Sequence, residues 1–112
     1  MAQCIFCQIV QGKLDSDIVQ EDPWAIALRD VNPKAPTHIL VIPKEHIPSL
    51  AEAPEEKSGL LGHLLLMIQK IARAQGLDAY RVVINDGAAA GQTVFHLHMH
   101  LLAGRMFSWP PG

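Results

Sequence analysis

Three of the six histidines in this 112-residue chain fall within five consecutive residues. His96, His98 and His100 alternate with three apolar residues in the segment HLHMHL. Successive side chains of a strand point to opposite faces, so this spacing places three imidazoles on one face, with neighbours about 6.5–7 Å apart. The pattern predicts a strand that gives one face to the core and the other to a functional site.

The histidine row permits three interpretations. Exposed or structural histidines are the first, but polar strand faces usually carry Thr, Lys, Glu or Ser. A zinc site is the second, although three nitrogens must converge within about 2.1 Å of one ion, which a straight strand seldom allows. The third is nucleophilic chemistry, because a neutral imidazole is a good nucleophile and close imidazoles resist joint protonation. The preceding turn GAAAGQT could offer backbone N–H groups to an anionic oxygen, which favours chemistry at phosphorus.

The elements that would position these side chains follow from apolar periodicity and turn residues. Residues 4–12 have helical apolar spacing and end on Gly12, which indicates a short helix. A longer helix is expected from Pro54 to Gly76, with two glutamates at its positive N-terminal end. Five strands are expected at residues 17–22, 24–30, 37–43, 80–86 and 93–104.

The long helix carries more apolar residues than one stripe requires. Leu60, Leu66 and Met67 fall outside the main stripe and indicate a second covered face. Because helices and strands do not alternate regularly, we expect an α+β fold, with a five-stranded, mostly antiparallel sheet, one long helix and a short N-terminal helix. The main stripe of the long helix is expected to be Leu61, Leu64, Leu65, Ile68, Ile71 and Ala72.

Size and composition exclude several classes of protein. A chain of this length suits one domain, so residues 1–112 are expected to form a single domain. The net charge of −2 and the lack of a lysine and arginine cluster argue against binding DNA or RNA as a polymer. There is no apolar run of membrane-spanning length, no signal-peptide pattern, and no disulfide framework. We expect a cytoplasmic protein without a membrane partner.

Cys4 and Cys7 form a C-x-x-C motif. This spacing supplies two of the four ligands that a structural zinc ion needs. A redox pair is less favoured, because the motif does not lie in a thioredoxin-like βαβ context. Two small apolar residues of a helix are the remaining interpretation.

The segment HLHMHLL resembles the signature of the histidine triad superfamily. Nearly the whole chain is similar to one branch, the histidine triad nucleotide-binding proteins, and the terminal WPPG is typical of that branch. The resemblance implies a homodimer in which two five-stranded sheets join into one of ten strands. It also implies hydrolysis of purine nucleoside phosphoramidates, derivatives of AMP or GMP, through a covalent nucleotidyl-histidine.

The resemblance assigns catalytic roles residue by residue. His98 matches the nucleophile that attacks the α-phosphorus, and His100 matches a partner of the phosphate. His38 matches a fourth active-site histidine. Thr93 stands where many members carry serine, so the hydroxyl is kept and a methyl group is added. The other implied phosphate contacts are Asn85, Gly91, Gln92 and Thr93.

The resemblance also implies a nucleoside pocket. Asp30 matches the carboxylate that holds the ribose hydroxyls, and an ionised carboxylate can accept from two hydroxyls at once. Trp109 would close the site from the tail of the partner subunit. The implied base contacts are Ile5, Phe6, Ile9 and Val31.

The resemblance completes the zinc hypothesis. Some members of the superfamily bind structural zinc through two such cysteines, the histidine of the PKEHI segment and the first histidine of the triad. Here these histidines are His46 and His96, so the implied ligands are Cys4, Cys7, His46 and His96.

Several of these residues also permit a purely structural interpretation. Asp30 could cap a turn, and Asn85 lies in a turn-rich segment. His38 could be an ordinary strand histidine, Trp109 could pack in a core, and His63 of the long helix is expected to be structural. Two other functions also stay open: cleavage of dinucleoside polyphosphates, as in the fragile-histidine-triad branch, and nucleotide-dependent regulation with incidental catalysis.

Overall fold

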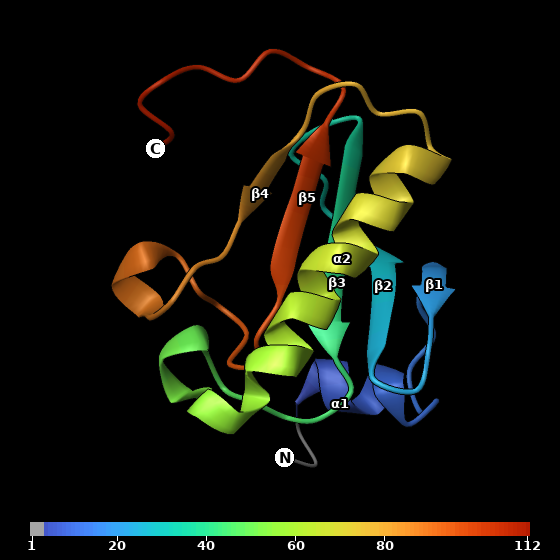
Figure 1. The fold of residues 1–112 in the computed structure, drawn as a ribbon, viewed down its shortest axis with the longest axis vertical. Helices are drawn as coiled ribbons and strands as arrows, with labels where there is room; N and C mark the ends of the chain where they lie inside the picture. Colours follow the sequence, from blue (N-terminus) through green and yellow to red (C-terminus); the bar gives the residue numbers. More distant parts are fainter. Residues whose placement is uncertain (1–3) are drawn as a thin grey trace.

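Five strands form one antiparallel sheet in the order β1-β2-β3-β5-β4. The computed structural model describes residues 4–112. Its architecture confirms the expected α+β class (Figure 1). The strands are β1 (Ile18–Glu21), β2 (Ala25–Arg29), β3 (Thr37–Pro43), β4 (Arg81–Val83) and β5 (Met99–Ala103). The α-helices are α1 (Ile5–Val10) and α2 (Ser58–Ala74), and the 3₁₀ turns are η1 (Leu50–Glu52), η2 (Glu55–Lys57) and η3 (Ala88–Ala90).

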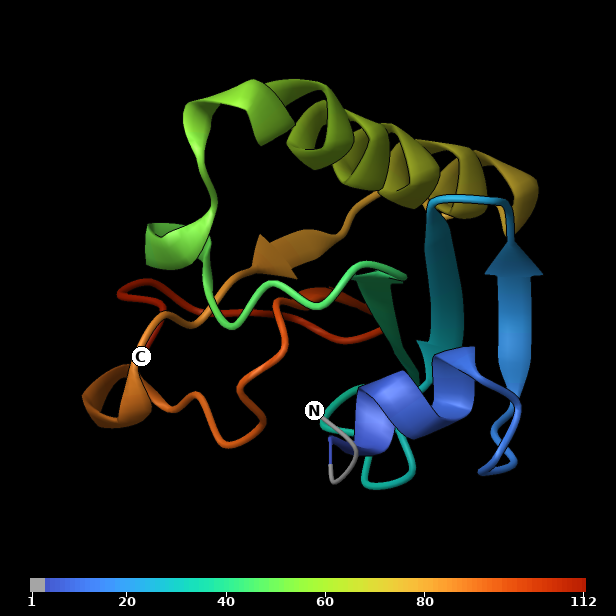
Figure 2. The same ribbon diagram turned by 90° about the horizontal axis from the view of Figure 1, so that it is seen from below.

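The two helices cover opposite faces of the sheet (Figure 2). On the α2 face, Ile39 and Val41 of β3 pack in one apolar cluster with the buried side of the helix. On the α1 face, Leu40 and Ile42 pack with Phe6 in a second cluster. Even-numbered residues of β3 therefore lie on the α1 face, because side chains alternate along a strand.

Helix α2 differs from the expected helix in two respects. It begins at Ser58 rather than Pro54, because residues 55–57 wind as a 3₁₀ turn in which the Lys57 N–H donates to the Pro54 carbonyl (2.9 Å). The expected stripe is also wrong in part, since Met67 is buried (2% exposed) while Leu65 is not (48%). Within residues 4–112, no helix combines the length and apolar character needed to cross a membrane.

Strand β5 is shorter than the sequence pattern predicts. It begins at Met99 rather than at residue 93, so only His100 of the three histidines is paired in the sheet. The reason lies at the end of β3, where the side chain of His96 donates to the Pro43 carbonyl (2.8 Å). The Leu97 N–H donates instead to the Ile47 carbonyl (2.6 Å). The chain leaves β3 here, yet the alternation of polar and apolar side chains continues.

His63 has a structural setting, which agrees with the sequence interpretation. Its Nε2 lies 2.6 Å from Asp22 Oδ2, and the other carboxylate oxygen accepts from the backbone N–H groups of Trp24 (2.8 Å) and Ala25 (2.9 Å). These contacts join α2 to the turn between β1 and β2.

Candidate active site and metal centre

The three histidines of the row belong to two clusters rather than one. His96 lies with the two cysteines and His46, whereas His100 contacts His38. His98 lies between the clusters, and its ring centroid is 5.0 Å from that of His100. A single ion held by all three histidines, the second interpretation of the pattern, is therefore wrong.

The first cluster has the geometry of a tetrahedral zinc site. Corners of such a site are about 3.3–3.8 Å apart when Zn–S is about 2.3 Å and Zn–N about 2.0–2.1 Å. The ligand atoms here all lie within 4.8 Å of one another. The measured separations are 3.4 Å for Cys4 Sγ–His96 Nδ1, 3.2 Å for Cys7 Sγ–His46 Nδ1, 3.6 Å for Cys7 Sγ–His96 Nδ1 and 3.2 Å for His46 Nδ1–His96 Nδ1.

The surroundings of this cluster also fit a metal ion. The Nε2–H of His96 donates to the Pro43 carbonyl, which leaves Nδ1 unprotonated and directed at the cysteines. Burial lowers the pKa of His96, so the imidazole is neutral, as a ligand must be. Burial raises the pKa of the Cys7 thiol, so its thiolate form needs a nearby cation. The four side chains therefore support a structural zinc ion, with no position left open for water.

His98 is oriented by the backbone of its neighbour. Its Nδ1 lies 2.7 Å from the His96 carbonyl, which can only accept, so Nδ1 carries the proton of the neutral ring. The Phe6 ring packs edge-on against the imidazole, with centroids 5.2 Å apart. No described residue bonds to Nε2, which keeps a free lone pair. This is the tautomer that a nucleophilic histidine requires.

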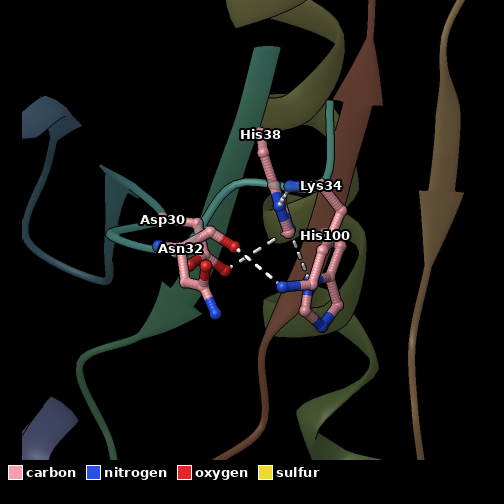
Figure 3. Close-up of polar contacts among 5 residues, drawn as sticks. All are labelled: Asp30, Asn32, Lys34, His38 and His100. Carbon is pink, nitrogen blue, oxygen red and sulfur yellow. Dashed lines mark hydrogen bonds and ion pairs between the residues drawn. The ribbon is translucent and has the colours of Figure 1, made fainter. Parts of the chain in front are cut away.

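His38 and His100 form a hydrogen-bonded pair (Figure 3). His98 lies next to His100. The Lys34 N–H donates to His38 Nδ1 (3.0 Å), so the proton of neutral His38 lies on Nε2. That Nε2 is 2.9 Å from His100 Nδ1 and 3.4 Å from Asp30 Oδ2. His100 Nδ1 accepts, and its own proton lies on Nε2. This Nε2 is buried and has no hydrogen-bond partner among residues 4–112.

The pair is neutral at physiological pH. Burial, together with the nearby imidazoles of His98 and His38, lowers the pKa of His100 to about 4, although the Asp30 carboxylate opposes the shift. Burial also lowers the pKa of His38, although the Asp30 carboxylate opposes this effect. The hydrogen-bonded pair is thus a chain of neutral donors and acceptors that ends on an N–H of His100.

Asp30, His38 and His100 also lie close enough together to suggest a second metal site. Their hydrogen bonds argue against it. A metal ion on His38 Nε2 would require the proton on Nδ1, but Nδ1 already accepts from the Lys34 N–H. The trio is arranged for hydrogen bonding instead.

A pocket of about 510 Å³ opens over these histidines on the α1 face of the sheet. One wall is apolar and comes from α1 and β2, and the other carries the histidines and the loop after β2. This combination of an apolar surface with a few convergent polar groups is typical of a small-molecule site. Its residues are Ile5, Phe6, Ile9, Leu14, Asp15, Ser16, Leu28, Arg29, Asp30, Val31, Asn32, Lys34, His38, Leu40, Thr93, Val94, His98 and His100.

The sequence model of the HIT domain matches residues 11–107. The chain belongs to the HIT domain family. Over 109 residues it is 56% identical to an uncharacterized HIT-like protein of Synechococcus elongatus, covering 96% of each chain. Over 111 residues it is 49% identical to the 14 kDa zinc-binding protein of Zea mays, covering 96% of this chain and 87% of the maize protein. The crystal structure of a HIT family hydrolase from Legionella pneumophila superposes with a TM-score of 0.96 at 45% identity, covering 98% of this chain and 100% of that one.

In this HIT domain, most of the residues expected around a nucleotide line the one pocket. They are Ile5, Phe6, Ile9, Asp30, Val31, His38, Thr93, His98 and His100. Val31 is almost fully exposed (97%), so it stands at the rim.

Four expected residues do not line this pocket. Asn85 lies beside Gly91, since a Cβ added at this glycine would be 3.8 Å from Asn85 Nδ2. Gly91 has a positive φ of 102°. The Gln92 side chain is buried and bonds to the Gly87 N–H and to the carbonyls of Pro48 and Val94, so it braces the loop. Trp109 is 82% exposed on the tail of its own chain.

Sequence reasoning missed several residues of the pocket. Lys34 is the most consequential, because its backbone N–H fixes the tautomer of His38 and its side chain lines the pocket. A lysine between two prolines, in NPKAP, was a signal of a rigid loop that holds a charge near the site. Leu14, Asp15 and Ser16 carry no comparable signal, since they follow the short helix in an irregular segment.

Proposed function

We propose that this protein hydrolyses purine nucleoside phosphoramidates, as expected for the histidine triad nucleotide-binding branch of the family. The observation that carries the proposal is the tautomer of His98. Its Nδ1–H is held by the His96 carbonyl, so the unprotonated Nε2 is available at the pocket. The Legionella relative is a hydrolase by name, and the WPPG tail is typical of the branch.

The reaction we propose has two steps. The lone pair of His98 Nε2 forms a bond to the α-phosphorus, and the P–N bond electrons leave with the amine, which takes up one proton from water. The His98 ring is then positively charged, with its Nδ1–H still donating to the His96 carbonyl. Water next attacks the phosphorus, the P–Nε2 bond breaks, and one proton is released. The products are the amine and the nucleoside monophosphate, and His98 returns to its neutral form.

The His100 donor supports the same assignment. Its Nε2–H has no partner within the described chain, and an unpaired buried donor is costly. A non-bridging phosphate oxygen would satisfy it and would gain negative charge as His98 attacks. A donor aimed at developing charge lowers the barrier of such a step.

The pocket has separate regions for the other parts of a nucleotide. The Asp30 carboxylate at its polar wall would accept from two ribose hydroxyls. A purine would lie against the apolar wall formed by Ile5, Phe6, Ile9 and Val31. Lys34 adds a positive charge to the lining of the pocket, where its Nζ donates to the Asn32 carbonyl (3.3 Å).

Substrate comparison tests the proposal. The wild-type protein is expected to convert adenosine 5′-phosphoramidate into equal amounts of AMP and ammonia. Its kcat/KM for this compound should exceed that for diadenosine tetraphosphate by at least about tenfold, because the ratio of these constants defines specificity. A preference for the tetraphosphate would assign the dinucleoside polyphosphate activity instead. Tight AMP binding without turnover would indicate a regulatory nucleotide-binding protein.

We also propose that the protein is a homodimer. Strand β4 is at an edge of the sheet, and Val82 on it is 37% exposed. Leu65 and Leu66 on α2 are 48% and 53% exposed, so apolar side chains remain outside the core. Sedimentation at micromolar concentration should give twice the chain mass of 12.3 kDa. A chain that stays monomeric would contradict both the ten-stranded sheet and the proposed contribution of the partner's tail to the site.

A further inference from the structure

Arg105 joins the start of the C-terminal tail to the loop that precedes β3. The tail leaves β5 at the end of the sheet opposite α1 (Figure 1). There the Arg105 Nε–H donates to the Lys34 carbonyl (2.9 Å), and its Nη1 donates to the Met106 carbonyl (3.1 Å). The guanidinium also lies over the Phe107 ring, 4.3 Å from its centroid. Arg105 is not among the residues that line the pocket.

The loop that Arg105 holds is already stiff. Residues 33–36 begin and end with proline, and Ala35 is buried. The residue before a proline is restricted to extended conformations, which limits Ala35 further. Gly104 packs so closely on Pro36 that a Cβ at this glycine would lie 2.8 Å from the proline side chain. The start of the tail therefore contacts the loop at two points, the Lys34 carbonyl and the Pro36 side chain.

The backbone of Lys34 connects Arg105 to the histidine pair. Its carbonyl accepts from Arg105, and its N–H donates to His38 Nδ1. The donor at Nδ1 decides the tautomer of His38, and the Nε2–H of His38 then decides that of His100 through the 2.9 Å contact (Figure 3). If the Lys34 N–H moved away, His38 could carry its proton on Nδ1. His100 would then carry its proton on Nδ1 as well, and its Nε2 would become an acceptor that repels a phosphate oxygen.

We propose that Arg105 is a positioning residue: through Lys34 it holds His38 in the Nε2–H tautomer and so keeps the proton of His100 on Nε2, facing the substrate. This role rests on the proposed phosphoramidate hydrolysis for its catalytic consequence. The tautomers themselves do not depend on which substrate the protein uses.

Arg105→Met tests this role, because methionine keeps an apolar stem over Phe107 and removes the donors. In the full chain purified with zinc, long-range ¹H–¹⁵N correlation at neutral pH should show Nε2–H for His38 and His100 in the wild type. The variant should show a second population protonated on Nδ1. Its kcat should fall by roughly tenfold with KM nearly unchanged, as when an outer partner that orients a functional histidine is removed.

Arg81→Met is the matched control. Arg81 lies over the same Phe107 ring (5.1 Å) and donates to the Ser108 carbonyl (3.0 Å), but it makes no bond to Lys34. This variant should keep the wild-type tautomers and kcat. The proposal is overturned if wild-type His38 is protonated on Nδ1, if Arg105→Met keeps the wild-type spectrum, or if Arg81→Met shifts the tautomers equally. A wild type that does not cleave phosphoramidates would reject the proposed substrate, while the spectra would still decide the role of Arg105.

Discussion

His98→Ala is expected to lower the turnover of adenosine 5′-phosphoramidate by roughly 10³–10⁶-fold, the range seen when a catalytic nucleophile is removed. The reason is specific to His98, because it combines a lone pair on Nε2 with a proton held on Nδ1 by the His96 carbonyl. Affinity for AMP should change little, since the apolar wall and Asp30 stay in place. Steady-state kinetics and calorimetric titration with AMP measure the two effects separately.

The control for this variant is His63→Ala. His63 is a half-buried histidine of α2, which covers the face of the sheet opposite the pocket, and it contacts Asp22. Its loss should reduce stability and leave kcat unchanged at temperatures where the variant is folded. Mass spectrometry of quenched wild-type enzyme should also detect a nucleotidyl adduct on His98. Unchanged turnover in His98→Ala would contradict the covalent mechanism.

Removal of zinc is expected to cause the largest loss of stability. An ion that binds only the folded chain contributes about 2.7–4.1 kcal/mol when its free concentration is 100–1,000 times its Kd. For a domain of this size, such a loss lowers Tm by roughly 10–25 °C. Thermal unfolding before and after chelation measures this effect, and elemental analysis should find one zinc per chain. The ligands tie α1 to the segment after β3 and to the segment before β5, so chelation should loosen three parts of the fold together.

Cys7→Ser supplies the control for chelation. Serine keeps the size of the side chain but is a poor zinc ligand, so this variant should already have the lower Tm and should not respond to a chelator. Its kcat should change little at temperatures where the variant is folded, because none of the four ligands lines the pocket. Less than about a tenth of a zinc per chain, with no rise in Tm on adding zinc, would contradict the site.

The alternation of polar and apolar side chains at residues 96–101 was predicted correctly from the sequence, but the start of the strand was not. Alternation reports which side of an extended chain meets the core, and this holds whether or not the backbone is paired. Pairing depends on the neighbour, and here the Pro43 carbonyl bonds to the His96 side chain instead of to a backbone N–H. Such competition between a side chain and the sheet cannot be deduced from spacing.

The two clusters show the same limit for the site. The four zinc ligands and the assignment of His38 and His100 to the site came from the family resemblance, and the structure brings Cys4, Cys7, His46 and His96 together. The spacing alone did not show that His96 lies with the cysteines, that His98 bonds to a backbone carbonyl, or that His100 pairs with another histidine. It depends on contacts between residues that are distant in the chain, such as His38 with His100. The role of Lys34 depends on a backbone N–H, which every residue but proline has.

The order of the strands has a consequence for how the chain folds as it is synthesised. β5 follows the other four strands of the sheet along the chain, yet it lies between β3 and β4. Until it arrives, β4 has no partner in the sheet and β3 exposes one edge, while α2 lacks the apolar side chains of residues 97–101 beneath it. Sheet closure by such distant segments is slow compared with local folding. The nascent chain must therefore carry an open edge on β3, a known route to aggregation, until β5 has been added.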